Sequence, residues 1–120
     1  MSVTDELIKI LDGFGFPSWL MHTMPAEQAY PDSFFTFLGV DSPFEAHYDN
    51  GPHAVIHSFW IGFYSNNPAL MQSVPMELAR RLMAAGWVME GLGEDVQSDE
   101  PTHTGRRFTA HYIQRIKKEE

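Results

Sequence analysis

The chain has 120 residues, a length that fits one hydrophobic core, so we expect a single domain over residues 1–120. Hydrophobic residues make up 43% of the sequence and aromatic residues 13%, a composition that excludes an intrinsically disordered chain. Eight Lys and Arg against 16 Asp and Glu give a formal charge of −8, which disfavours nucleic acid as a partner. The absence of cysteine excludes disulfides, thiolate metal sites and cysteine nucleophiles.

The first residues of the chain do not resemble a targeting segment. Asp5 and Glu6 precede only a short apolar stretch, whereas a signal peptide begins with basic residues and continues into a long apolar run. No apolar run approaches the roughly 18 residues that a membrane span needs. We therefore expect a cytoplasmic protein without a membrane partner.

A short helix is predicted over residues 3–12. Ser2, followed three residues later by Asp5, is a typical N-cap arrangement, and Gly13 is a stop signal. The next segment, residues 14–31, is predicted to be irregular because one glycine and three prolines interrupt every periodic pattern in it. These four residues are Gly15, Pro17, Pro25 and Pro31.

Two strands are predicted next, over residues 33–40 and 53–65, with a long connection between them. The second strand alternates, but both of its faces are apolar. One face carries Val55, Phe59, Ile61 and Phe63, and the other carries Ile56, Trp60 and Tyr64. A solvated face would show polar residues, so we expect helices to cover one side and another subunit to cover the other.

A second helix is predicted from Asn67 and Pro68 to Gly86, kinked or restarted at Pro75. Two more strands follow, over residues 87–89 and 106–117. The resulting order is α-β-β-α-β-β. This order predicts an α+β fold in which an antiparallel sheet of about four strands carries two helices on one face.

No motif in the sequence predicts a catalytic residue, a cofactor or a metal. His53 and His57 invite a zinc interpretation, but four residues on a strand separate their Cα atoms by roughly 13 Å, which favours two histidines at a sheet surface or subunit contact. His103, Asp99 and Glu100 lie close in sequence, yet they are also typical of a turn between strands. Neither a glycine-rich phosphate loop nor a nucleophile elbow is present.

Charge is unevenly distributed near the end of the chain. An acidic stretch precedes a basic strand, and separate patches of opposite sign would suit head-to-tail contacts that close into a ring. The alternative is a set of ion pairs within one chain, and both stay open at this point. The acidic residues are Glu90, Glu94, Asp95, Asp99 and Glu100, and the basic ones are Arg106, Arg107, Arg115, Lys117 and Lys118. The expected subunit interface contains Trp60, Tyr64, Asp99, Glu100, Arg106 and Arg107.

Three strings, kept in order at residues 48–50, 59–68 and 98–106, resemble small proteins encoded in the structural modules of phages and prophages. They read Tyr-Asp-Asn, Phe-Trp-Ile-Gly-Phe-Tyr-Ser-Asn-Asn-Pro and Ser-Asp-Glu-Pro-Thr-His-Thr-Gly-Arg. The resemblance covers residues 33–113, and within that group it points to tail terminator or tail-completion proteins of long-tailed phages.

The resemblance implies an α+β subunit of a ring, typically hexameric, that caps the tail tube and meets the head connector. Such a protein would be found in the bacterial host cytoplasm and in the virion, with other tail or head-connector proteins as partners. The resemblance carries no catalytic residue onto this chain, and it does not cover residues 14–31.

Two other classes of protein remain open from the sequence. The first is a small-molecule-binding domain or small enzyme with a pocket between the second helix and the sheet, lined by His57, Trp60 and Tyr64. The second is an adaptor that stays monomeric until a different protein binds it.

Overall fold

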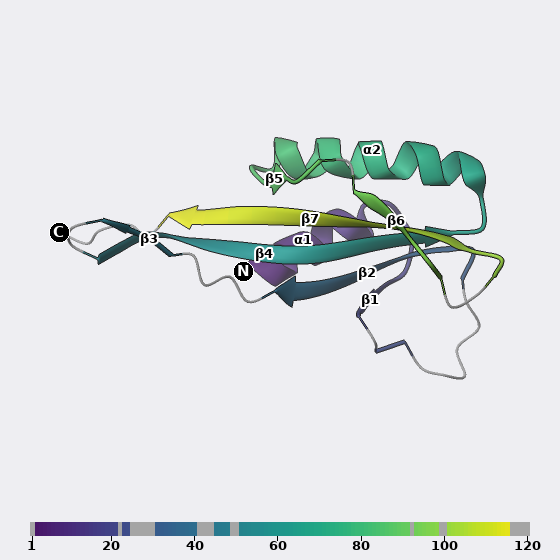
Figure 1. Ribbon diagram of the computed structural model, residues 1–120, viewed down its shortest axis with the longest axis horizontal. Coiled ribbons are helices and arrows are strands. Elements are labelled where there is room, and N and C mark those ends of the chain that lie inside the picture. Colours follow the sequence, from purple (N-terminus) through teal and green to yellow (C-terminus); the bar gives the residue numbers. More distant parts are fainter. Residues whose placement is uncertain are drawn as a thin grey trace.

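The computed structural model describes residues 2–21, 23–24, 31–40, 45–48, 51–91, 93–98 and 101–115. Within these residues the fold is α+β, with two helices and seven strands (Figure 1). The helices are α1 (Val3–Asp12) and α2 (Pro68–Ala84). The strands are β1 (Ser18–Leu20), β2 (Ser33–Val40), β3 (Glu45–Tyr48), β4 (Gly51–Ser65), β5 (Val88–Met89), β6 (Glu94–Val96) and β7 (Thr104–Arg115).

All seven strands belong to one sheet, whose central path runs β1-β2-β4-β7-β5, with β3 paired to β4 and β6 paired to β7. The β1–β2 pair is parallel and the other pairs are antiparallel. The predicted α+β class is confirmed. The predicted antiparallel four-stranded sheet and the order α-β-β-α-β-β are wrong, because the sheet is mixed and has three further strands.

The three further strands lie in segments that the sequence predicted to be connections. β1 lies within residues 14–31, where the carbonyl of Pro17 accepts a hydrogen bond from the N–H of Phe35 at 2.9 Å. Pro17 therefore sits at the start of the strand, where a proline is tolerated. β3 and β6 are also short, and each pairs along a single neighbour, β4 or β7. Three- or four-residue pairings of this kind leave no periodic pattern in a sequence.

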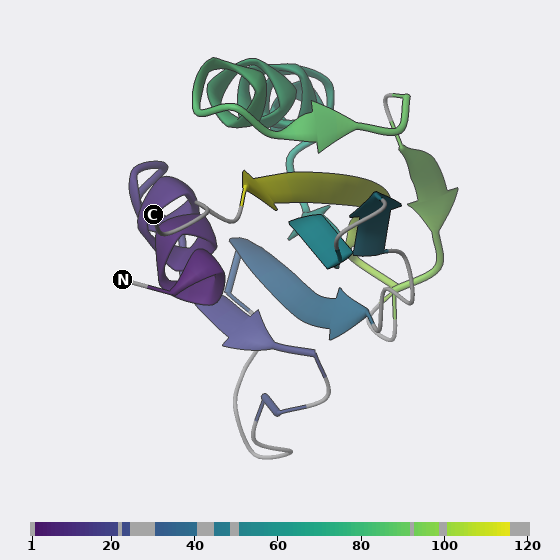
Figure 2. The same cartoon turned by 90° about the vertical axis from the view of Figure 1, so that its left-hand side faces the viewer.

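Both helices pack on the same face of the sheet. Leu7 and Leu11 of α1 and Leu78 and Leu82 of α2 are buried in one apolar cluster. In the end-on view of Figure 2, α1 lies at the left and α2 at the top of the molecule. The sheet contributes alternate residues of three strands to the same cluster, and these are Phe35, Phe37, Phe59, Ile61, Phe63, Phe108 and Ala110. The prediction that Phe59, Ile61 and Phe63 share one face of β4 is confirmed, and this is the face that the helices cover.

The helix ends follow the capping signals of the sequence. Ser2 caps α1 in a complete capping box with Asp5. Asn67 caps α2 by accepting from the N–H of Ala69 at 2.9 Å. The predicted restart at Pro75 is wrong, since α2 runs through this residue as one helix. Pro75 is buried, so its packing offsets the hydrogen bond that its missing N–H cannot make. Within the described residues, no helix is long and apolar enough to cross a membrane.

β4 has 15 residues and extends past the part of the sheet that the helices cover (Figure 1). Its first residues pair with β3, and Ala54 pairs with Arg115 near the end of β7. In Figure 1 this part of the sheet extends beyond the ends of both helices, as an arm at the left of the view. The principal extents of 54 × 28 × 22 Å reflect this elongation.

A charged cluster joins α2 to the segment after α1. Glu77 accepts hydrogen bonds from Arg80 and Arg81, and the Arg81 guanidinium lies 4.1 Å from the ring centroid of Phe14. Hydrogen bonds from Arg80 and then from Arg81 lower the pKa of Glu77 from 4.5 to about 2. A lowered folded-state pKa gives stability that is present above the unfolded pKa of about 4.5 and lost as the pH falls toward 2.

Replacing Glu77 with Gln is therefore expected to lower the melting temperature slightly near pH 7 and by much less near pH 2. The effect near neutral pH is small because these side chains are solvent-exposed. Thermal unfolding followed by circular dichroism at both pH values measures the difference. An equal loss at both pH values would show that the carboxylate charge is not the cause.

Candidate functional site

The face of the sheet opposite the helices is here called the open face. In a strand alternate side chains point to opposite faces, so the residues between the core positions of β2, β4 and β7 lie on it. Val88 of β5 joins them because it pairs with His111. The open face therefore includes Leu38, Ile56, Ser58, Trp60, Tyr64, Val88, Arg107, Thr109, His111 and Ile113.

One end of the open face is covered by a small aromatic cluster. Phe34 is buried there, stacked on Tyr64 with ring centroids 5.1 Å apart and edge-on to Trp19 at 5.7 Å. His103 closes the cluster, and its Nε2 bonds the carbonyl of Pro31 at 2.7 Å. The Tyr64 ring rests over Gly105 of the neighbouring strand, where an added Cβ would lie only 2.5 Å from the ring. Tyr64 therefore belongs to a packed cluster within the chain.

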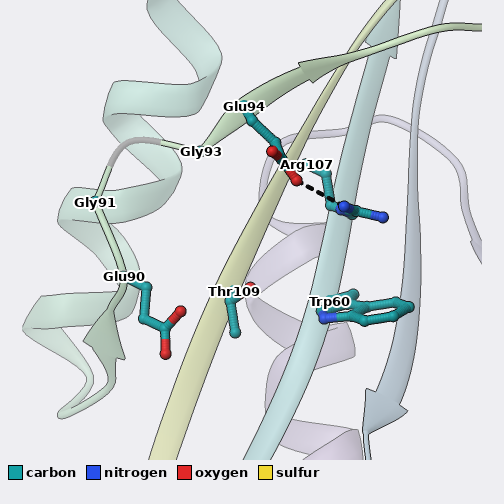
Figure 3. A pocket seen from close by; sticks show the side chains of 7 residues that line it. All are labelled: Trp60, Glu90, Gly91, Gly93, Glu94, Arg107 and Thr109. Carbon is teal, nitrogen blue, oxygen red and sulfur yellow. Dashed lines mark hydrogen bonds and ion pairs between the residues drawn. The ribbon is translucent and has the colours of Figure 1, made fainter.

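The middle of the open face is a shallow hollow of about 320 Å³ around Trp60. Figure 3 shows the Arg107 side chain beside the indole ring, with the dashed contact from Arg107 to Glu94 above it. The guanidinium lies 5.0 Å from the Trp60 ring centroid and bonds Glu94 at 2.6 Å. The remaining lining comes from Glu90, Gly91, Gly93 and Thr109. Trp60 is thus flanked by paired charges in a hollow that is mostly polar.

Next to this hollow, three polar side chains form a continuous hydrogen-bonded chain. Ser58 Oγ lies 2.7 Å from Nδ1 of His111, and Nε2 of His111 lies 2.7 Å from Oε1 of Glu90. Ser58 and His111 face one another across the β4–β7 pair. Glu90 is held beside them because its N–H donates to the carbonyl of Thr109 at 3.0 Å.

Two alternatives were open for the charges near the end of the chain, separate patches or ion pairs within one chain. β6 pairs with β7, which places Glu94 opposite Arg107 and Asp95 opposite Arg106. The Arg106–Asp95 contact measures 3.0 Å, so both arginines of the expected interface have acidic partners within the chain. The alternative of ion pairs within one chain therefore holds for these residues. Asp99 and Glu100, also expected at the interface, lie outside the described residues.

The three histidines singled out in the sequence lie in different places. His57 is on the helix side of β4 and bonds Gln114 at 2.8 Å, whereas His103 belongs to the aromatic cluster. His53 is part of β4, and its side chain lies outside the described residues. Among the residues with described side chains, no group of three His, Asp or Glu is placed to hold a metal ion.

The three residues expected to line a pocket between α2 and the sheet do not lie together. A hollow of about 380 Å³ lies at the start of α2, but Leu70 and Ser33 are in its lining and none of the three expected residues is. Of the three residues expected to line a pocket there, His57 is on the helix side of the sheet, while Trp60 and Tyr64 are on the open face. The alternation of the β4 residues separates them, because odd and even positions on one strand point to opposite sides.

Sequence reasoning missed the chain of Ser58, His111 and Glu90. These residues are 53 and 21 positions apart, and no local motif relates them. Only the register between β4 and β7 brings Ser58 opposite His111. The group could have been identified only from a correct prediction of the β4–β7 register.

A scan against models of known protein families and a search among curated proteins find no match to this chain.

Proposed function

We propose that this chain is an assembly subunit of a phage or prophage tail, of the terminator or completion type, that acts by self-association and docking. The observation that supports it most directly is the apolar strip on the open face. Val88 is 50% exposed and Ile113 is 45% exposed there, and Ile113 pairs with the partly exposed Ile56. Ser58, Thr109 and His111 lie on the same face, so the strip covers only part of it, but adjoining exposed apolar residues are typical of a contact surface.

The surroundings of the strip suit a protein interface. Interfaces typically have an apolar centre and a polar rim, and they are enriched in Trp and Arg. Here the strip is bordered by the Arg107–Glu94 pair and by the His111–Glu90 contact. These charges are already paired within the chain. A partner could therefore cover them without leaving an unpaired charge in the interface.

The arm favours a second copy as the partner. A ribbon of β3 with the adjoining ends of β4 and β7 lies beyond the helices (Figure 1). Ribbons of two or three strands have little stability alone, so a neighbour that packs on the arm would stabilise it. The arm adjoins the strip, because Ile56 and Ile113 pair one position from Val55, which pairs with β3. In a ring the arm of one copy would pack on a different surface of the next, and such heterologous contacts close when the rotation permits.

Replacing Ile113 or Val88 with Glu tests this proposal. We expect the wild-type chain to form a defined multimer, six copies in the case of a hexameric ring, and each substitution to weaken it about 10- to 1,000-fold by placing a charge in the apolar strip. Both residues are half exposed in the monomer, so the fold should survive. Light scattering at concentrations from about micromolar to millimolar measures the mass.

Met83→Glu is the matched control. Met83 is 58% exposed but lies on α2, away from the open face, so this variant should associate like the wild type. Equal weakening by Met83→Glu would argue against the strip as the contact surface. A strict monomer at every concentration would contradict self-association in solution and favour the adaptor class, in which a different tail or head-connector protein covers the strip.

A further inference from the structure

The chain of Ser58, His111 and Glu90 has the order of groups that makes a serine hydroxyl nucleophilic. A serine is a weak nucleophile until a neighbouring base accepts its proton, and a third group commonly orients that base. In this protein the base is His111, 2.7 Å from Ser58 Oγ, and the orienting group is Glu90, 2.7 Å from the other ring nitrogen.

The hydrogen bonds determine which nitrogen of His111 accepts a proton. An ionised carboxylate can only accept hydrogen bonds, so Nε2 must carry the hydrogen that Glu90 binds. In the neutral ring Nδ1 then has a free lone pair and accepts the O–H of Ser58. This is the tautomer that a general base for Ser58 requires. The two ring nitrogens have exchanged the positions that they hold in the familiar protease triad, but the proton transfer is equivalent.

We propose that Ser58 is a nucleophilic serine that becomes acylated by activated carboxylic esters. Ser58 Oγ attacks the ester carbonyl carbon while its proton passes to Nδ1 of His111. The bond from that carbon to the leaving oxygen then breaks, and His111 gives the proton to that oxygen. The products are acyl-Ser58 and an alcohol, and nothing is oxidised or reduced.

The position of Ser58 in the sheet limits which esters can react. β4 is an interior strand at this point, paired with Val40 of β2 and with His111 of β7. The N–H of Ser58 therefore belongs to the sheet and is not free to stabilise an oxyanion, which is a large part of the rate in efficient hydrolases. The hollow around Trp60 shares Glu90 with this chain of groups, but neither Ser58 nor His111 lines it, so this hollow is not a formed acyl pocket for Ser58. We expect reaction with good leaving groups and no rapid turnover.

Diisopropyl fluorophosphate, which phosphorylates activated serines and releases fluoride, is a direct probe of this hydroxyl. We expect a single adduct on the peptide that contains Ser58, found by mass spectrometry of the digested wild-type protein. Ser58→Ala should abolish it, and His111→Asn should slow it by about 100-fold, at the low end of general-base effects. Glu90→Ala should slow it about tenfold, because Glu90 is exposed and acts only by orienting His111.

His57→Asn is the matched control, since His57 lies on the same sheet but bonds Gln114 instead of a serine. It should label at the wild-type rate, and the exposed Ser73 of α2 should stay unlabelled in every variant. Circular dichroism checks that each variant is folded. No adduct on wild-type Ser58, or an equal rate in folded His111→Asn, overturns the proposal. Because Glu90→Ala changes a surface residue, it keeps the test decisive if His111→Asn does not fold.

Discussion

Replacing Leu78 with Ala is expected to destabilise the fold by about 2–5 kcal/mol. Leu78 is fully buried and projects from α2 into the core cluster against the sheet. The substitution removes three carbons and leaves a cavity, because the surrounding aromatic side chains are too rigid to fill it completely. Domains of this size are stable by only about 5–15 kcal/mol, so the loss is a large share of the total.

Urea unfolding followed by tryptophan fluorescence measures this loss as a lower midpoint with an unchanged slope. Met76→Ala, on the same helix, is the control. Met76 is 65% exposed, and its truncation should change the free energy of unfolding by no more than about 0.5 kcal/mol. Similar losses for the two variants would mean that α2 does not pack on the sheet through Leu78.

Replacing Gly105 with Ala is expected to cost about 1–3 kcal/mol, although it adds a single methyl group. A Cβ at this position would lie 2.5 Å from the Tyr64 ring and 2.9 Å from a methyl carbon of Val96. Tyr64 cannot easily move away, because its ring is stacked on the buried Phe34. The strain would therefore spread through the aromatic cluster at this end of the open face.

Gly39→Ala is the matched control within the same sheet. Its Cβ would lie 3.6 Å from the Phe59 ring, an ordinary contact distance, so the variant should be neutral or slightly more stable than the wild type. Thermal unfolding separates the two substitutions, since each kcal/mol shifts the melting temperature by roughly 4 °C in a domain of this size. Equal melting temperatures for Gly105→Ala and Gly39→Ala would show that the Tyr64 ring moves aside without a loss of stability.

The sequence predicts the parts of the fold that depend on local signals. The caps at Ser2 and Asn67 define where the helices begin. The alternation in β4 correctly separates the core residues Phe59 and Ile61 from the open-face residue Trp60, because that pattern depends on one strand alone. The α+β class follows from these elements.

Features that depend on pairing between distant segments could not be predicted. Arg107 could bind either another subunit or Glu94 of its own chain. The β6–β7 register decides between these, and the order of charges along the sequence does not reveal that register. Likewise, His57 and Trp60 are close in sequence but lie on opposite faces of the sheet. Ser58 and His111 meet only because two strands 53 residues apart align.

The β4–β7 ladder has a consequence for the rate of folding. Its innermost pair, Ser65 with Thr104, joins positions 39 apart, and its outermost pair, Ala54 with Arg115, joins positions 61 apart. Closing loops of this length costs chain entropy before any contact can compensate for it. α2 lies within the segment that joins β4 to β7. The two ends of that segment must therefore be brought together while the ladder forms. Proteins dominated by such distant pairings fold on the millisecond-to-second scale, whereas helical bundles fold within microseconds to milliseconds.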